Sequence, residues 1–383
     1  MKICHLGYDD LDNPWLGGGG AIRAREIYRR LAPRHEITLV TGGYPGAARE
    51  EWVDGLRIVR LGGCADAETA QGYARSRLSY CRWAPAYLQR ADWDVWVHEF
   101  SAYVPLWIPR ARRRRGILLF QHFMGHHALA KHKLVGAVAW AAEKWTLRAY
   151  PRIITVSPSV EQLVRAQLGK RPVQVDCVYN GVEADYFDLR SEEDDYVLYF
   201  GRTDVHTKGM DVLIEAFARL AADYPSLQLK IAGRSGNARQ NQLLAELIDR
   251  HDLRRRVEVV GTVADKDKRE LLRRALFLCL PSRYEGWCIV AIEAGAAGKA
   301  VVGTRISGLQ DAIRHGETGL LVESGRPEQV AEAMRQLLDA ADQRRCLGEQ
   351  GRAWARRFDW DRIAEDHEEI CLRAVRQNGL AHK

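Results

Sequence analysis

The sequence lacks long apolar runs, paired cysteines and the leader pattern of a secreted protein. No window approaches the roughly 18 unbroken apolar residues of a membrane-spanning helix. The eight cysteines are scattered singly, without C-x-x-C or other metal-ligand spacing, which argues against a disulfide scaffold or a zinc site. The N-terminal segment MKICHLGYDD is too polar for a signal peptide. We therefore expect a reduced, cytoplasmic protein.

Length and charge add further constraints. A chain of 383 residues predicts two domains, each large enough to bury its own core. The net charge of +7 is uneven: residues 1–175 carry 26 Lys and Arg against 15 Asp and Glu, whereas residues 176–383 carry 31 against 35. A basic first half would suit an anionic acceptor, a membrane surface or nucleic acid.

The most informative stretch is 278–303, LCLPSRYEGWCIVAIEAGAAGKAVVG. An apolar run over 276–280 predicts a strand, and a loop, a helical pattern and a second strand follow. Glu285 lies in the loop and Glu293 in the helix. Eight helical residues rise about 12 Å, which is close to the distance from the sugar to the ribose of a nucleotide sugar. The helix N-terminus between the two carboxylates suits a diphosphate. A solvated loop glutamate and a surface ion pair are the alternative interpretation.

Two glutamates in an S-x-x-E-G-x-x-x-x-x-x-E-A context resemble the donor signature of glycosyltransferase family 4. The similarity spans most of the chain and is strongest over 196–338. It implies the GT-B fold, an α/β architecture of two Rossmann-like domains that face each other across a deep cleft. It also implies a retaining enzyme that uses a nucleoside-diphosphate sugar, most simply UDP- or GDP-linked, and requires no metal or other cofactor.

A pair of cations lies between a predicted strand, 196–200, and a predicted helix that starts at Met210. Arg202 and Lys208 there could hold a diphosphate and stabilise it as a leaving group, although surface ion pairs would explain them too. In its G-R-x(5)-K-G context, the pair resembles the diphosphate-binding residues of the family. The resemblance implies further donor contacts, partly through backbone groups, at Gly201, Gly233, Arg234, Val263, Trp287, Cys288, Ile289 and Glu293.

Glycines precede the helix predicted over 21–31, and glycines at such a place allow a close approach to a phosphate or a sugar. A flexible turn would explain the run equally well. In the resembled family this loop reaches the donor phosphates, which implies that role for Gly18, Gly19 and Gly20.

Histidines end two predicted strands of the first half, at the edge where open α/β sheets place their ligands. His122 matches the cleft histidine of the family, which faces the donor sugar; a core or helix-capping histidine is the alternative. His98 and Glu99 would face the acceptor. The histidines at 126, 127 and 132 lack a completing carboxylate or cysteine, so we expect no metal site.

The turn dipeptide Asn180-Gly181 resembles the interdomain hinge of the family. We expect an acceptor domain over 1–180, a donor domain over 181–358, and a terminal helix within 359–383 that crosses back to the first domain. The sequence departs from the family at Glu285-Gly286-Trp287-Cys288, where E-G-F-G is common. This difference leaves the identity of the donor sugar undetermined.

The resemblance assigns catalytic roles to four side chains. Arg202 and Lys208 would stabilise the departing diphosphate, while Glu285 and His122 would orient the donor sugar. Glu293 would bind the ribose hydroxyls and is not among these four. No carboxylate is placed as a nucleophile, so the resemblance implies a front-face reaction. The D-x-D strings lack the context of a glycosyltransferase metal site.

Three basic segments interleave with aromatic residues within 73–148 and suit an anionic membrane surface, so the protein either stays free in the cytoplasm or lies at the inner membrane face. Solvated charge on helices that bury their aromatics is the alternative. We expect no nucleic-acid partner, because no recognition motif is present and the second half is acidic. Two other functions stay open: a non-hydrolysing sugar-nucleotide epimerase, and a non-catalytic binder of anionic surfaces.

Overall fold

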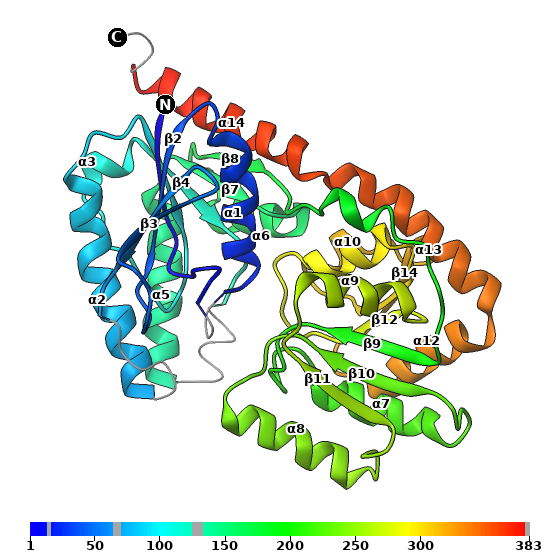
Figure 1. The fold of residues 1–383 in the computed structure, drawn as a ribbon. Helices are drawn as coiled ribbons and strands as arrows, with labels where there is room; N and C mark the ends of the chain where they lie inside the picture. Colours follow the sequence, from blue (N-terminus) through cyan, green and yellow to red (C-terminus); the bar gives the residue numbers. More distant parts are fainter. Residues whose placement is uncertain (14–16, 64–69, 125–132, 380–383) are drawn as a thin grey trace. The chain divides into compact units, whose positions relative to one another are not determined.

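The computed structural model describes residues 1–13, 17–63, 70–124 and 133–379. Its internal contacts divide the chain into two units (Figure 1). The first unit comprises Met1–Asn180 together with Trp360–Lys383, and the second comprises Gly181–Asp359.

The first unit contains an eight-stranded sheet in the order β3-β4-β2-β1-β5-β6-β7-β8. All pairs are parallel except β3 with β4, which form an antiparallel edge. The strands are β1 (Lys2–Leu6), β2 (Glu36–Gly42), β3 (Glu50–Val53), β4 (Leu56–Leu61), β5 (Val95–Glu99), β6 (Gly116–Phe120), β7 (Arg152–Thr155) and β8 (Gln174–Cys177). Their near-continuous burial explains the short apolar runs of the sequence, since a parallel sheet is covered on both faces.

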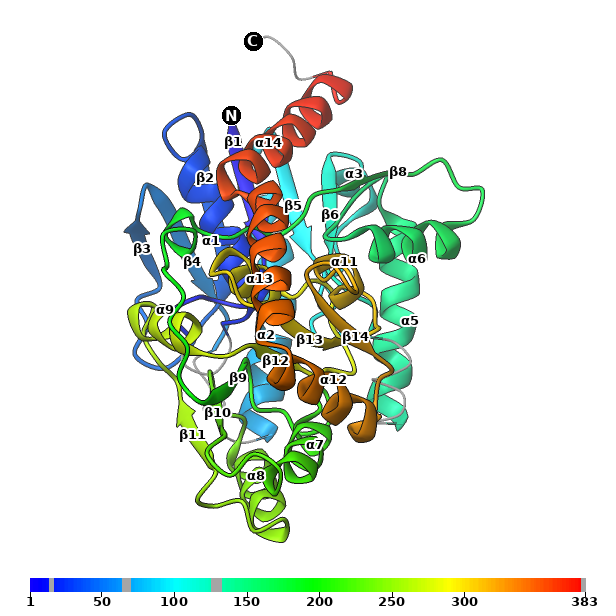
Figure 2. The same ribbon diagram turned by 90° about the vertical axis from the view of Figure 1, so that its right-hand side faces the viewer.

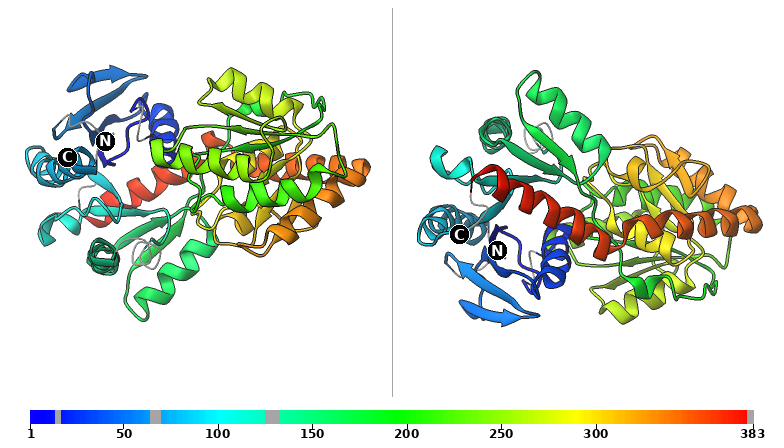
Figure 3. Two further views of the ribbon diagram at one scale, coloured as in Figure 1. Left: turned by 90° about the horizontal axis from the view of Figure 1, so that it is seen from below. Right: turned by 90° about the horizontal axis from the view of Figure 1, so that it is seen from above.

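Helices flank this sheet, and the last helix of the chain belongs to the same unit. They are α1 (Gly19–Leu31), α2 (Ala70–Gln89), α3 (Arg110–Arg113), α5 (Lys133–Ala149), α6 (Pro158–Leu168) and α14 (Trp360–Gln377). Helix α14 lies beside α1, as both views of Figure 3 show, and the Tyr28 hydroxyl of α1 is 3.1 Å from Nε2 of His367 in α14. Helix α6 begins where the sequence predicts, with the Ser157 side chain accepting a hydrogen bond from the Val160 N–H.

The second unit contains a six-stranded parallel sheet in the order β11-β10-β9-β12-β13-β14. The strands are β9 (Tyr196–Phe200), β10 (Gln228–Ala232), β11 (Val257–Gly261), β12 (Leu278–Leu280), β13 (Val301–Thr304) and β14 (Gly319–Val322). The helical segments are η1 (Ala184–Tyr186), α7 (Met210–Ala221), α8 (Ala238–Arg250), α9 (Asp265–Arg274), α10 (Ile289–Ala296), α11 (Leu309–Ala312), α12 (Pro327–Asp339), α13 (Ala341–Ala355) and η2 (Arg356–Phe358). Helices α7 and α12 lie side by side on this sheet (Figure 2).

The observed elements differ from the predicted ones mainly in short or edge segments. Strand β3 was not predicted, because it is short, polar and half-exposed at a sheet edge. The strand expected over 276–280 covers only Leu278–Leu280. Helix α1 begins at Gly19, so the last two glycines of the run form its first turn. Within the described residues, no helix is both long enough and apolar enough to cross a membrane.

Candidate active site

The strand order of the second sheet determines where a ligand can bind. From β9 the chain moves outward to β10 and β11, and then returns to β12 on the other side of β9. In open parallel sheets, ligands bind at the carboxyl ends of the two strands where the order reverses. The crevice is therefore expected after Phe200, which ends β9, and after Leu280, which ends β12.

Two loops that follow these strands are tied together there. The Arg283 N–H donates to the carbonyl of Thr207 at 2.9 Å, and its guanidinium makes two 2.8 Å hydrogen bonds to Asp211 at the start of α7. Gly209 has φ +69°, and a Cβ there would lie 2.1 Å from the carbonyl oxygen of Pro281. Glycine is thus required where the first loop crosses the end of β12.

These ties bring Lys208 against Glu285. The Lys208 ammonium contacts Oε1 of Glu285, which also accepts a 3.2 Å hydrogen bond from the hydroxyl of Ser282. The Lys208 and Glu285 side chains are 18% and 14% exposed, so the ion pair is largely desolvated. Arg202 lies in the first loop with an exposed side chain, and its carbonyl accepts a hydrogen bond from the Tyr199 hydroxyl. Lys208 and Glu285, which the sequence analysis assigned to the same donor site, therefore lie in contact.

Glu293 is the fifth residue of α10 and its carboxylate is buried, whereas Glu285 lies in the loop before the helix. The expectation of eight helical residues between the two carboxylates is therefore wrong, because α10 begins only at Ile289. Its Oε1 accepts a 2.6 Å hydrogen bond from the Lys268 ammonium on α9. Among the residues that the structure describes, Oε2 of Glu293 has no hydrogen-bond partner. Burial, followed by the negative charges of Glu293 and Asp265, raises the pKa of Tyr186 well above its ordinary value, and its hydroxyl lies near enough to the Glu293 carboxylate to interact with it, although no bond to Oε2 forms.

Two side chains of the segment before α10 are buried. Trp287 packs edge-on against Phe358 with the ring centroids 5.0 Å apart, and the Cys288 side chain is also buried. No side chain caps the N-terminus of α10 at Cys288. The Ala291 N–H donates to the Cys288 carbonyl at 3.1 Å, so the N–H groups of Ile289 and Val290 are the ones the helix start can offer to a ligand.

The other predicted donor residues of this unit follow strand ends on the same edge. Gly233 has φ +116°, and a Cβ there would lie 2.4 Å from the carbonyl oxygen of Gly201. These glycines therefore let the ends of β9 and β10 pack closely. Arg234 follows directly, and its carbonyl accepts a 3.1 Å hydrogen bond from the Thr203 N–H. Val263 follows β11 and is half-buried.

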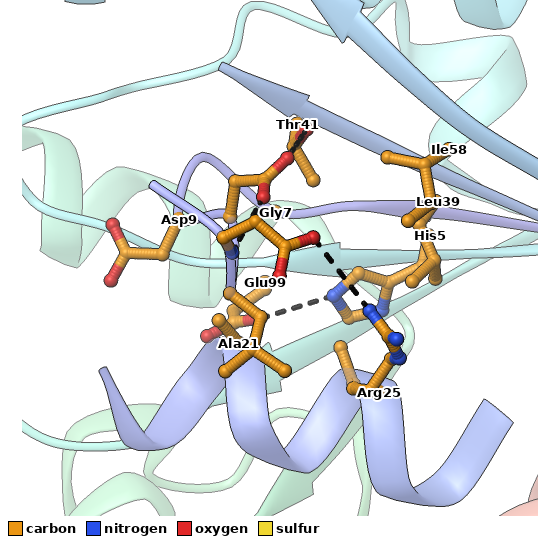
Figure 4. A pocket seen from close by; sticks show the side chains of 13 residues that line it. His5, Gly7, Asp9, Ala21, Arg25, Leu39, Thr41, Ile58 and Glu99 are labelled. Atoms are coloured by element: carbon orange, nitrogen blue, oxygen red, sulfur yellow. Dashed lines mark hydrogen bonds and ion pairs between the residues drawn. The ribbon is translucent and has the colours of Figure 1, made fainter. Parts of the chain in front are cut away.

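The first sheet reverses its order between β1 and β5, so its ligand edge lies at Gly7 and Glu99. Glu99 and His5 point toward each other in Figure 4, with Oε2 3.0 Å from Nε2. The Gln121 amide donates to Oε1 of Glu99 at 2.6 Å. A Cβ at Gly20 would lie 2.0 Å from the same oxygen. Because Gly20 has no side chain, the Glu99 carboxylate can occupy this space.

The hollow in front of this carboxylate is small, about 20 Å³. Such a volume holds one water molecule or one hydroxyl-sized group. Asp9, Thr41 and Arg25 also line it (Figure 4), together with Asp10 and Asp12. The charge of Asp10 is compensated, because its carboxylate pairs with the buried Arg60 at 2.8 Å.

The prediction that His98 faces the acceptor is wrong for its side chain. His98 has no exposed surface, its Nδ1 lies 2.9 Å from the Tyr150 hydroxyl, and it belongs to the core of the first unit. Burial and the neighbouring His5 lower its pKa to about 3. Successive side chains of a strand point to opposite faces of the sheet, so His98 and Glu99 of β5 have different surroundings. Glu99 ends the strand at the ligand edge, whereas His98 packs into the core.

His122 is exposed and follows β6 by two positions. Gly18 is the residue before α1, and both Gly18 and Gly19 are exposed. Their contacts with a donor stay predictions. The histidines at 126, 127 and 132 lie outside the described residues. Within the described ranges, no three His, Cys, Asp or Glu side chains are grouped closely enough to hold a metal ion.

Sequence reasoning missed Lys268, His5 and Gln121. Lys268 lies among alternating charges of an exposed-looking helix, DKDKRELLRR, and nothing in that pattern indicates that one lysine points inward. His5 lies inside an apolar strand, where its partner is more than ninety positions away.

Two family models match the chain, and together they cover most of it. The model described as Glycosyltransferase Family 4 matches residues 17–186. The model described as Glycosyl transferases group 1 matches residues 182–354.

Relatives and solved structures are consistent with these matches. Glycogen synthase of Mycobacterium tuberculosis is 31% identical over 242 residues, 62% of this chain and 57% of that protein. Phosphatidyl-myo-inositol mannosyltransferase of the same species is 33% identical over 222 residues, 55% of this chain and 56% of that protein. The chain thus aligns with a little over half the length of these relatives. The structure of sucrose-phosphate synthase from Thermosynechococcus elongatus superposes with a TM-score of 0.83 at 22% identity and covers all of both chains.

Two Rossmann-like parallel sheets and this structural likeness define the GT-B fold of glycosyltransferases. The chain belongs to glycosyltransferase family 4.

Proposed function

We propose that this protein transfers a sugar from a nucleoside-diphosphate sugar, UDP- or GDP-linked, to a hydroxyl group of a glycan, a lipid-linked glycan or a small metabolite, with retention at the anomeric carbon. One observation carries the proposal: Lys208 and Glu285 lie in contact at the ligand edge of the second sheet, and the buried Glu293 on the following helix, α10, has a carboxylate oxygen without a hydrogen-bond partner among the described residues. A cation for the phosphates and a carboxylate for each set of hydroxyls are what such a donor requires.

In the proposed reaction, the donor diphosphate binds Arg202, Lys208 and the first-turn N–H groups of α10. Sugar hydroxyls donate to Glu285, and ribose hydroxyls donate to Glu293. The bond between the anomeric carbon and the phosphate oxygen breaks, and its electron pair stays on the diphosphate, where the cations stabilise it. The acceptor oxygen bonds to the same face of the carbon and passes its proton to the departing phosphate oxygen. His122 and the glycines at 18–20 remain proposed donor contacts.

On the acceptor side, Glu99 is the proposed contact. It ends β5 at the reversal point of the first sheet, with His5 and Gln121 holding its two oxygens. Each carboxylate oxygen has more than one lone pair, so Glu99 can also accept a hydrogen bond from a hydroxyl of the acceptor substrate.

A thermal-shift screen against UDP-, GDP- and ADP-sugars tests donor binding. We expect at least one of them to stabilise the wild type, because a ligand at a hundred times its Kd adds about 2.7 kcal/mol. Lys208→Ala should abolish the shift. Lys230→Ala is the matched control, because Lys230 also pairs with a carboxylate, Glu258 at 3.3 Å, but lies within β10. If no sugar nucleotide shifts the wild type, the proposal fails.

The reaction type is tested with the donor that binds. A retaining transferase releases free nucleoside diphosphate only when an acceptor is present, and NMR of the first product shows the anomeric configuration of the donor. An epimerase would instead convert the donor without an acceptor. Because Arg202 and Lys208 replace a metal in the proposal, chelation with EDTA should leave the rate unchanged.

A second proposal concerns location: the protein is cytoplasmic and binds the inner membrane face through its first unit. Residues 100–142 contain seven Lys and Arg but no Asp or Glu. Trp107 is 74% exposed and stacks on Trp145 with the ring centroids 4.5 Å apart, and Arg113 lies 4.7 Å from the second ring. An exposed indole beside an arginine suits the interface of an anionic bilayer.

Sedimentation with vesicles tests this location. We expect binding to vesicles that contain phosphatidylglycerol but not to phosphatidylcholine alone, and Trp107→Ala should weaken it. Trp52→Ala is the control, because Trp52 is 64% exposed on β3. Equal binding of the two variants would contradict the proposal.

A further inference from the structure

Lys268 is held more firmly than a surface lysine. Its ammonium donates to Oε1 of Glu293 at 2.6 Å, and the two side chains are only 12% and 9% exposed. The ammonium also lies 4.9 Å from the ring centre of Phe200 and 5.7 Å from that of Tyr186. A desolvated cation over aromatic faces and beside a carboxylate has a defined position.

This position is at the ligand edge of the second sheet. Phe200 is the last residue of β9, and the loop that carries Arg202 and Lys208 follows it directly. Glu293 is the fifth residue of α10 and lies in its second turn. The N-terminus of the same helix is where the diphosphate is proposed to bind. The contact that Lys268 makes there is with the buried carboxylate of Glu293.

The ion pair leaves one carboxylate oxygen without a partner. Within the described part of the chain, Oε2 of Glu293 accepts no hydrogen bond although it is buried. A buried acceptor left unsatisfied is costly, so this oxygen should bind a hydroxyl donor when a ligand is present. Because Lys268 holds Oε1, it also determines which oxygen is offered and in which direction.

We propose that Lys268 is a positioning residue for ribose: it orients Glu293 so that Oε2 accepts a hydrogen bond from a ribose hydroxyl, and it thereby makes nucleotide binding selective for ribonucleotides. This inference rests on the proposed function, since it assumes that a nucleotide binds at this edge. A lysine that served only to stabilise the fold would contribute equally to the binding of ribo- and deoxyribonucleotides.

The experiment compares ribose with its deoxy forms by isothermal titration calorimetry. UDP, GDP and ADP are titrated first, and the nucleotide that binds the wild type most tightly is then compared with its 2′-deoxy and 3′-deoxy analogues. A hydrogen bond to a charged group predicts a loss of about tenfold or more in affinity for at least one deoxy analogue.

Lys268→Met keeps the apolar stem over Phe200 but removes the charge. We expect it to reduce the ribose preference to about threefold or less, with little change in the affinity for the deoxy analogue. Lys230→Met is the matched control, because Lys230 lies 4.7 Å from the Tyr196 ring and pairs with Glu258, and it should leave the preference unchanged.

Removing one partner of a buried ion pair can destabilise the fold. Lys268→Arg therefore serves as a rescue variant, which keeps the charge and should retain most of the ribose preference. In a Glu293→Gln background, Lys268→Met should cause no further loss of preference, because both residues act through the same hydroxyl.

The outcomes are distinct. An unchanged ribose preference in Lys268→Met, or an equal loss of affinity for ribo and deoxy forms, overturns the inference but leaves the proposed function standing. If the wild type binds none of the three nucleotides, the proposed function itself fails.

Discussion

Mild acid should destabilise the first unit through His98, which is buried among aromatic side chains. Its ring has no exposed surface, it lies 6.4 Å from the Phe100 ring, and Nδ1 contacts the Tyr150 hydroxyl. Burial is the main reason that its pKa in the folded protein falls to about 3, and the charge of the neighbouring His5 contributes. An unfolded chain has a histidine pKa of about 6.5.

The direction of the effect follows from which state binds the proton first. As the pH falls below about 6.5, the unfolded chain takes up a proton that the folded protein refuses, so unfolding becomes easier until the folded pKa is reached. Between pH 7.5 and 5.5 this linkage lowers the free energy of unfolding by about 1.4 kcal/mol for His98 alone. His367, whose pKa burial also lowers well below its ordinary value, should add a loss of the same sign.

Urea unfolding of the wild type and of His98→Gln at the two pH values measures this loss. The variant should be less stable at pH 7.5 because it disturbs the core, but its additional loss at pH 5.5 should be smaller than that of the wild type by about 1.4 kcal/mol. His206→Gln, a change at an exposed position of the second unit, should keep the full loss. If His98→Gln loses as much stability as the wild type between the two pH values, His98 titrates freely and the reasoning is refuted.

The same unit supports two further predictions. Gly20→Ala should lower the melting temperature and Gly18→Ala should not, because a Cβ at 20 would lie 2.0 Å from the Glu99 carboxylate whereas one at 18 meets nothing closer than 3.6 Å; equal melting temperatures would contradict this. Tyr28→Phe removes a hydroxyl that contacts two buried histidines and should cost about 2 kcal/mol in urea unfolding, against about 1 kcal/mol for Tyr80→Phe, which loses one bond to a carbonyl. Equal costs would show that the histidine contacts add no stability.

The sequence alone was sufficient for the local units of the donor side. The order of Glu285 in a loop and Glu293 in a helix was read correctly, and α10 forms over Ile289–Ala296 because an apolar, Gly-terminated segment follows a buried strand. The loop that carries Arg202 and Lys208 was placed correctly, because a parallel strand that precedes a helix puts its loop at the carboxyl edge of the sheet. The roles of the two side chains remain predictions. In these cases local pattern determines the element on which each residue lies, whereas the contact of Lys208 with Glu285, 77 positions away, depends on the packing of two loops.

Only the tertiary structure decided which charges are buried and which oxygen remains free. Lys268 and Glu293 are on different helices, and His5 and Glu99 on different strands, so their pairing depends on the packing of elements that local pattern does not specify. For the same reason the burial of His98 escaped prediction: a histidine at a strand end looks alike in sequence whether its side chain faces the ligand edge or the core. Helix and strand periodicity come from neighbours along the chain, whereas desolvation is set by neighbours in space.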